Sequence, residues 1–300
     1  MIFYTINYVQ VRSNKKPCIL IRRGDRVKKC LCIFSLIVLL MVCVKLNFLN
    51  NDTSIDGKIL FCMNNDRPAI YDCSDKTIKQ LDASAFQAVF AGDGTILLNK
   101  YDSICKYNAD TGESAIIYQG EDFDFLTVCN DKLLSLSKDN LIYLYDMEKR
   151  QKEILLQDSG SCIHAWSDDG KLLYYSDMTN KIKCLDTLAN EITEIGTGRS
   201  PAVRNSFIAY KDKDRLIVVN LKTGKKYSYS GAAYTYCFSP DGSELLIETE
   251  MTLNTGIKNL FQDGTVLGHK LIAWNYEKNK KITVVDSGIK PSSLIFDWRR

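Results

Sequence analysis

The chain has 300 residues with 39 Lys/Arg, 36 Asp/Glu and two His, which gives a formal net charge of +3. That small value hides an asymmetry, because residues 1–29 carry eight Lys/Arg against the single Asp25, while residues 30–300 carry 31 Lys/Arg against 35 Asp/Glu. The net charge of −4 on the larger part disfavours nucleic-acid recognition there.

The basic arm at residues 1–29 is followed by an apolar stretch at residues 30–49. Cys30–Val44 contains no charged residue, and with Lys45–Leu49 the stretch reaches 20 residues, about the length of a membrane-spanning helix. Lys45 lies near one end, from which its side chain can reach the interface. Because the basic flank precedes the span, the positive-inside rule places the arm in the cytoplasm and the rest outside. We therefore expect a single-pass, type II signal-anchor in the cell membrane, with the lipid bilayer as one partner.

The sequence disfavours two other N-terminal processing routes. A cleaved signal peptide needs small residues of the Ala-x-Ala kind at its cleavage site, and VKLNFLNNDTS offers none. A lipoprotein anchor at Cys43 is disfavoured by the bulk of Val42.

The basic arm fits a topology determinant close to anionic headgroups, and the alternative is a cytoplasmic docking or nucleic-acid arm. Residues 50–55 form a polar stalk that includes Asn51-Asp52-Thr53, a match to the glycosylation acceptor pattern.

From residue 56 onward the sequence repeats at a nearly constant interval. The clearest copy is YTYCFSPDGSELLI at residues 234–247, an apolar run, an Asp-Gly turn and a second apolar run. The turn markers lie at Asp56, Asp93, Asp131, Asp169, Asn205 and Asp241, so the steps are 37, 38, 38, 36 and 36 residues. Such regularity over five steps indicates a repeat architecture.

Each repeat predicts four short strands in about 37 residues. Asp-Gly between apolar runs predicts a hairpin whose two central residues both take positive φ. A second hairpin with an Asp or Asn near its start follows each marker, and no repeat has a helical pattern. One four-stranded sheet cannot bury both faces alone, so the repeats must stack. Radial stacking gives a β-propeller, and a solenoid, whose repeats are shorter, is the alternative.

The element F-S-P-D-G-S-E-L-L-I and the Y-D/N…T-G hairpin resemble the repeats of WD-repeat-like and TolB-type propellers. The resemblance covers about residues 55–300, although the Gly-His and Trp-Asp dipeptides of true WD repeats are absent. It implies an all-β, six-bladed β-propeller over residues 56–300 and says little about function.

The ring is expected to close through the C-terminus. Three residues before five of the markers lie Phe90, Val128, Trp166, Ala202 and Phe238, which are apolar as the innermost strand of a blade should be. The first repeat has Thr53 there and lacks its inner strand. Residues 292–298 (SSLIFDW) supply a candidate, which would remove the exposed edges of an open ring.

The sixth repeat is longer than the others, with the excess at residues 251–268. Strand alternation predicts that this insertion lies on the face where the central channel opens. Long loops on rigid scaffolds often bind ligands, and the alternative is an extra hairpin that covers an edge.

Cysteine and histidine give no catalytic or metal-binding pattern. Seven of the 11 cysteines follow the apolar stretch, an odd number that argues against a complete disulfide framework, so we expect small buried hydrophobic residues. No zinc spacing is present. His164, two residues before Trp166, and His269 are expected to be structural hydrogen-bonding residues rather than catalytic bases.

The functional hypotheses follow from the anchor and the scaffold. The first is an extracytoplasmic binding module for a protein, peptide or glycan, with no catalytic set, metal or cofactor. Its binding face would include residues 251–268 and the Arg199–Arg204 connection, with Arg199, Arg204, Lys258, Phe261 and Asp263 as candidate residues. The second is a membrane-tethered enzyme, lactonase- or lyase-like, with its site in the channel. The third is a sensor that signals through the basic arm, which is too short to fold as a domain.

Overall fold

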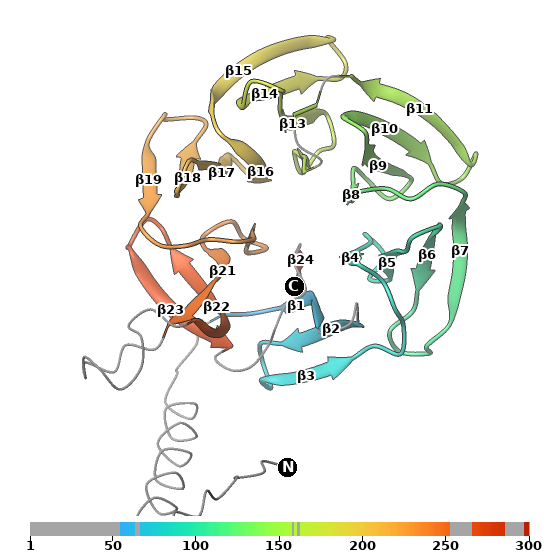
Figure 1. Ribbon diagram of the computed structural model, residues 1–300, viewed down its shortest axis with the longest axis horizontal. Helices are drawn as coiled ribbons and strands as arrows, with labels where there is room; N and C mark the ends of the chain where they lie inside the picture. Colours follow the sequence, from blue (N-terminus) through green and yellow to red (C-terminus); the bar gives the residue numbers. More distant parts are fainter. Residues whose placement is uncertain are drawn as a thin grey trace, which may run out of the picture. The chain divides into compact units, whose positions relative to one another are not determined.

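The computed structural model describes residues 55–63, 67–157, 159–160, 163–252, 266–285 and 297–299. These residues form strands, turns and loops, and the strands make six four-stranded antiparallel sheets around an axis (Figure 1). The expected all-β, six-bladed β-propeller with four-stranded blades is therefore confirmed. Within the described ranges, no helix has the length and apolar character needed to span a bilayer. The expected anchor at residues 30–49 lies outside those ranges.

The strand bounds follow the repeat. The strands are β1 (Lys58–Met63), β2 (Arg67–Asp72), β3 (Thr77–Gln80), β4 (Gln87–Phe90), β5 (Ile96–Asn99), β6 (Ser103–Tyr107), β7 (Ser114–Gln119), β8 (Phe125–Val128), β9 (Leu133–Lys138), β10 (Leu141–Asp146), β11 (Gln151–Leu156), β12 (Ala165–Trp166), β13 (Leu172–Ser176), β14 (Lys181–Asp186), β15 (Glu191–Thr197), β16 (Arg199–Arg204), β17 (Phe207–Asp212), β18 (Arg215–Asn220), β19 (Lys226–Tyr229), β20 (Tyr236–Phe238), β21 (Leu245–Thr252), β22 (Val266–Asn275), β23 (Lys280–Val285) and β24 (Asp297–Arg299).

Each blade runs from an inner strand beside the axis to an outer strand at the perimeter (Figure 1). Blade one has the order β24-β1-β2-β3, and blade two has the order β4-β5-β6-β7. Blades three to six follow in the same way, beginning with β8, β12, β16 and β20. The apolar residues three positions before five of the six markers lie in these inner strands, as expected.

The closing strand comes from the other end of the chain. β24 pairs antiparallel with β1, with Ile59 opposite Trp298 and Leu60 opposite Asp297. Trp298 is 1% exposed, and its indole N–H donates to the backbone oxygen of Asp56 at 2.8 Å. The predicted closure by the C-terminus is thus confirmed for residues 297–299, while residues 292–296 lie outside the described ranges.

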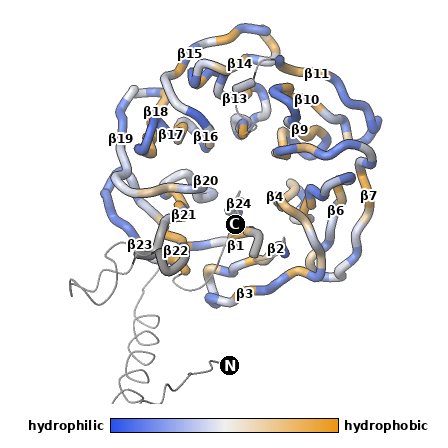
Figure 2. Tube along the Cα trace, viewed as in Figure 1, coloured by the Kyte–Doolittle hydropathy of each residue, from blue (hydrophilic) through white to orange (hydrophobic). Residues whose placement is uncertain are grey.

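Apolar packing occurs between blades as well as within them. Six clusters of buried residues each join two neighbouring blades, for example Ile59 and Phe61 of blade one with Leu246 and Leu271 of blade six. Figure 2 shows apolar segments running through every blade rather than gathered in one place. Each sheet buries a face only against its neighbours, so the blades stabilise one another.

The Asp-Gly turns differ from the expected two-residue turn. Gly94 and Gly170 have φ of 81° and 67°, whereas the preceding aspartates do not have positive φ. The N–H of Gly94 donates to the oxygen of Ala91 at 3.1 Å, so the turn is a longer loop that ends in a left-handed glycine. The expectation of two positive φ values was wrong here. That geometry occurs instead at Asp139–Asn140, between β9 and β10.

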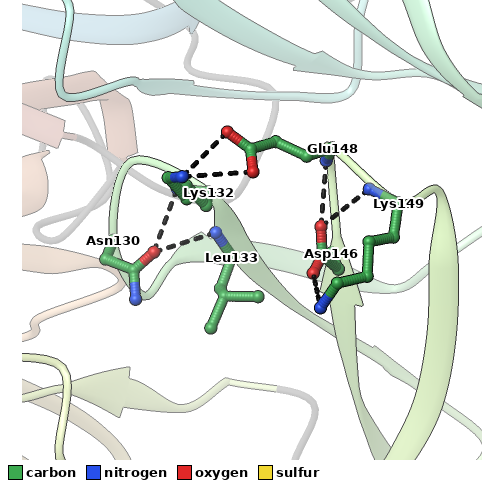
Figure 3. A network of polar contacts seen from close by, with 6 residues as sticks. All are labelled: Asn130, Lys132, Leu133, Asp146, Glu148 and Lys149. Atoms are coloured by element: carbon green, nitrogen blue, oxygen red, sulfur yellow. Dashed lines mark hydrogen bonds and ion pairs between the residues drawn. The ribbon is translucent and has the colours of Figure 1, made fainter.

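The Asp or Asn at the start of each second hairpin caps the turn between the third and outer strands. The Asp146 carboxylate accepts backbone N–H groups of Glu148 and Lys149 at 3.0 and 2.9 Å (Figure 3). Equivalent bonds are made by Asp72, Asn108, Asp186, Asn220 and Asn275. Asn130 does the same in the preceding turn of blade three, and an exposed Lys132–Glu148 ion pair joins the two turns. These side chains replace backbone hydrogen bonds that the turns lack.

The excess length of blade six starts as an extension of its central hairpin. β21 and β22 have eight and ten residues, and their pairing continues to Thr252 opposite Val266. Residues 253–265 lie outside the described ranges.

Candidate functional site: the central channel

The inner strands surround a channel with a cavity volume of about 700 Å³. Residues of β4, β8, β12, β16, β20 and β24 line it, together with the first residues of the turns that follow them. The wall includes aromatic side chains such as Trp166, Tyr236 and Phe238. It also includes Asp131, Asp168 and Arg204, so apolar and charged groups face the same space.

Charged side chains in this wall form bonds between blades. The Arg204 guanidinium of blade five lies 3.0 Å from the Asp168 carboxylate of blade four. The second oxygen of Asp168 accepts the backbone N–H of Asn205 at 2.7 Å, and the Asn205 amide donates to the backbone oxygen of Asp241 at 2.9 Å. This chain of contacts links blades four, five and six. Arg204 Nε is buried without a hydrogen-bond partner among the described residues.

The closing strand makes similar bonds to blade two. The Asp297 carboxylate accepts the backbone N–H of Phe90 at 2.8 Å, and Arg299 donates to the backbone oxygen of Ala91 at 2.8 Å. Gln87 bridges blades two and three, because its side-chain amide bonds both the N–H and the oxygen of Leu126. Inner strands have one edge without a neighbouring strand, so backbone N–H and C=O groups there lack a strand partner. These side chains bond some of those groups.

His164 lines the channel and belongs to a buried hydrogen-bonded group that includes Ser135 behind the wall. The Ser135 hydroxyl lies 2.7 Å from His164 Nε2 and accepts the Trp166 indole N–H at 2.7 Å. The His164 ring also packs edge-on against Phe125, with 5.2 Å between ring centroids. Ser135 is 0% exposed and His164 is 2% exposed. A nucleophile must reach a substrate, so this Ser–His contact favours a structural role for His164. His269 lies in β22, opposite Glu250.

The described cysteines are free thiols rather than disulfides. Cys73, Cys105, Cys129 and Cys184 are buried, and Cys237 is half-buried, as expected for small hydrophobic residues. Burial raises the pKa of Cys129 to about 11 and that of Cys237 well above its usual value. Both line the channel, and a thiol with a raised pKa is a poor nucleophile.

The aspartates of the Asp-Gly turns bond locally and away from the channel. The Asp93 carboxylate accepts from Thr95 Oγ1 at 2.5 Å and pairs with Lys106 at 2.6 Å. Asp169 and Asp241 bond Ser167 and Ser239 of their own turns. The prediction that these residues shape turns is confirmed. The described part of the chain contains no group of three or more His, Cys, Asp or Glu side chains that could bind a metal.

Comparisons with known proteins agree with this architecture. No protein-family model matches the sequence, and no curated protein matches it. Among solved structures, TolB from Acinetobacter baumannii superposes with a TM-score of 0.64 at 14% identity, over 81% of this chain. The fold is that of a TolB-type six-bladed propeller. The chain spans 66% of the length of that TolB chain. A chain of a mitotic checkpoint complex superposes with a TM-score of 0.50 at 14% identity, over 80% of both chains. At these identities the likeness concerns the fold alone.

The propeller does not bring the candidate binding residues Arg199 and Arg204 together. Arg199–Arg204 is the inner strand β16 rather than a loop, so its two arginines lie at opposite ends of one strand. Arg204 lines the channel, and Arg199 is exposed at the other end. Lys258, Phe261 and Asp263 lie outside the described residues.

Other channel residues had no distinct signal in the sequence. Asp168 is the first acid of the Ser-Asp-Asp-Gly turn. The presence of two acids is the only sequence feature indicating that one carboxylate can bond outside the turn. Asp131 packs against Gly92 of blade two, where an added methyl group would lie 1.8 Å from its carboxylate oxygen. The sequence does not distinguish Ser135 from other strand serines, and its contacts with His164 and Trp166 become evident only in the structure.

Proposed function

We propose that this chain is a membrane-tethered propeller whose ring lies outside the cytoplasm and binds a protein partner through the channel. The apolar stretch at residues 30–49, with its basic flank, supports the tether and the orientation. The fold supports the interaction role, since rigid propeller rings present loops and inner walls as recognition surfaces. The sequence leaves open whether the ligand is a peptide segment or a glycan.

The observation that carries the proposal is the chemistry of the channel wall. Trp166 and Phe238 provide apolar contact area, while Asp168, Arg204 and Asp131 provide charged groups in the same cavity. Binding sites are typically concave and largely apolar, with a few polar groups that fix orientation. The wall is held by bonds between blades, so a partner would meet a preformed surface.

The alternative of a lactonase- or lyase-like channel enzyme has less support. The Ser135–His164 pair is buried, and the channel thiols have raised pKa values. Neither group offers an activated nucleophile to the cavity.

Photo-crosslinking tests where the partner binds. A photoreactive residue at Val128, which lines the channel, should form a protein adduct in the producing cells, whereas one at Leu188, exposed in a turn of blade four, should not. Arg204→Glu should remove the Val128 adduct by reversing the charge beside Asp168. A Val128 adduct that is absent, or that survives Arg204→Glu unchanged, contradicts a channel site.

A loop replacement tests the contribution of residues 253–265. Because Thr252 and Val266 are paired, an Asn-Gly turn joining them should preserve β21 and β22. We expect unchanged thermal unfolding and a loss of the adduct if Lys258, Phe261 and Asp263 contribute to binding. An unchanged adduct would remove these three residues from the proposal and leave Arg204 as the sequence-derived candidate.

A further inference from the structure

Blades five and six carry a concentration of lysine at equivalent positions of their outer hairpins. In each blade one lysine lies in the Asx-capped turn and two lie at the start of the outer strand, and all are exposed. We call this surface the lysine edge, and its members are Lys222, Lys225, Lys226, Lys278, Lys280 and Lys281. The corresponding positions of blade one carry Ser74, Thr77 and Ile78, so the repeat itself does not require lysine.

The two halves of the lysine edge form one surface. Lys281 Nζ of β23 lies 4.2 Å from the ring centroid of Tyr229 in β19. The Tyr227 hydroxyl of β19 donates to the Glu277 carboxylate of blade six at 3.2 Å. Lys225 also lies over the Tyr227 ring, at 4.9 Å. These contacts place the outer hairpins side by side and set the lysines against tyrosine rings.

The lysine edge has an excess of positive charge. Several exposed lysines of other blades pair with carboxylates, as Lys106 does with Asp93 and Lys132 with Glu148, although Lys79 bonds a backbone oxygen instead. By contrast, none of the six lysines lies within ion-pair distance of a carboxylate in the described part of the chain. Glu277, Glu244, Asp241 and Asp56 are nearby, and Glu277 bonds Tyr227. A partner of opposite charge would therefore meet six lysines against four acids.

The lysine edge also borders the point at which the chain enters the propeller. Ile55 and Asp56 line a cavity of about 250 Å³ together with Asn275 and Lys278. The proposed membrane span ends six residues earlier, and six extended residues reach at most roughly 20 Å. A tether of that length would keep the lysine edge within reach of the lipid headgroups.

We propose that the lysine edge docks on the anionic headgroups of the membrane that holds the tether, an inference that rests on the tether of the proposed function. Basic clusters beside a membrane anchor are attracted to anionic lipid, with roughly a fivefold gain in binding per residue.

Lysine acylation of the full-length protein in vesicles tests the docking. One vesicle set contains phosphatidylcholine alone, and the other contains an equimolar mixture with phosphatidylglycerol. We expect several-fold slower acylation of Lys226, Lys278 and Lys281 in the anionic vesicles, with the difference removed by high salt. Lys132 and Lys213, on other surfaces, should react equally in both. Equal acylation of the lysine edge in the two vesicle types would overturn the docking.

Matched variants separate this inference from its alternatives. K225Q/K280Q/K281Q should abolish the lipid-dependent protection of Lys226 and Lys278, whereas K132Q/K149Q/K213Q, with the same charge loss, should leave it intact. Protection by soluble polyphosphate but not by anionic lipid would make the partner a different polyanion and overturn the proposal. Release of the chain from vesicles by alkaline carbonate would overturn the tether itself, and the docking with it. A retained chain with unprotected lysines would overturn the docking alone.

Discussion

The inner and outer strands of the ring come from the same repeat but differ in their exposure to water. Every residue of the inner strand β4 is buried, and every residue of the outer strand β3 is exposed. Inner strands bond the backbones of neighbouring blades through side chains such as Asp297 and Gln87. Outer strands have one edge open to solvent. The stability of the ring therefore depends mainly on the strands inside the perimeter, among which β5 is also fully buried, and this leaves the perimeter free to vary.

The perimeter shows how the six open edges are protected from pairing with other chains. The outer strands β3 and β19 have only four residues each. In the other four blades, the pairing of the third and outer strands contains a register shift, for example between Ile142 and Tyr143 in β10. Short strands and bulges are both known ways to discourage edge-to-edge aggregation. The outer strands are thus shaped by solubility, and they can carry exposed isoleucine or lysine.

The largest effect is expected from Trp298→Ala in the closing strand. This change removes a fully buried side chain from the cluster that joins blades one and six, and with it the hydrogen bond to Asp56. We expect the free energy of unfolding to fall by about 3–5 kcal/mol, as for other buried Trp truncations. Urea unfolding followed by circular dichroism measures it. Trp298→Phe should recover part of the loss, and a loss below about 1 kcal/mol would show that the closing strand contributes little.

A smaller effect is expected from Ser135→Ala behind the channel wall. The variant leaves the Trp166 indole N–H and His164 Nε2 without this partner, and a buried unsatisfied group costs about 1–3 kcal/mol. Ser176→Ala is the matched control, since Ser176 is equally buried but its hydroxyl has no partner among the described residues. We expect the control to be neutral or stabilising. Equal losses in the two variants would contradict a specific role for the Ser135 hydrogen bonds.

The inner strands also show what sequence could and could not predict. The period, the Asx-capped turns and the closure near Trp298 were readable because each depends on residues close together in sequence or on a missing strand. The Asp168–Asn205 and Ser135–His164 contacts were not, since each joins different blades 29 to 37 residues apart. The shape of the Asp-Gly turn was misjudged because the same dipeptide fits two hairpin geometries. The binding roles of Arg199, Arg204, Lys258, Phe261 and Asp263 stay predictions.

Asp93→Asn tests a surface ion pair in a turn, with a smaller expected loss. The hydrogen bond from Lys106 lowers the Asp93 pKa to about 2. Because the folded pKa lies below the unfolded value of about 3.9, this stabilisation is complete above that value and is lost as pH falls through about 2. The carboxylate is half-exposed, so we expect a loss under about 1 kcal/mol at pH 7. Urea titrations between pH 7 and pH 2 should show a shallower acid slope for this variant and for Lys106→Met. Slopes equal to that of the unmodified protein would contradict the pairing.

The smallest effect is expected at the perimeter itself, from Ile154→Thr in the outer strand β11. Ile154 is 51% exposed, and threonine keeps the β-branched shape that strands favour. The free energy of unfolding should change by less than about 0.5 kcal/mol. Ile142→Thr in β10 of the same blade is the matched control, because Ile142 is 0% exposed and the same substitution there buries a hydroxyl. That control should lose more than about 1.5 kcal/mol. If the two variants lost stability equally in urea unfolding, the outer strand would be as important to the ring as the buried strand beside it, and the contrast between the interior and the perimeter would fail.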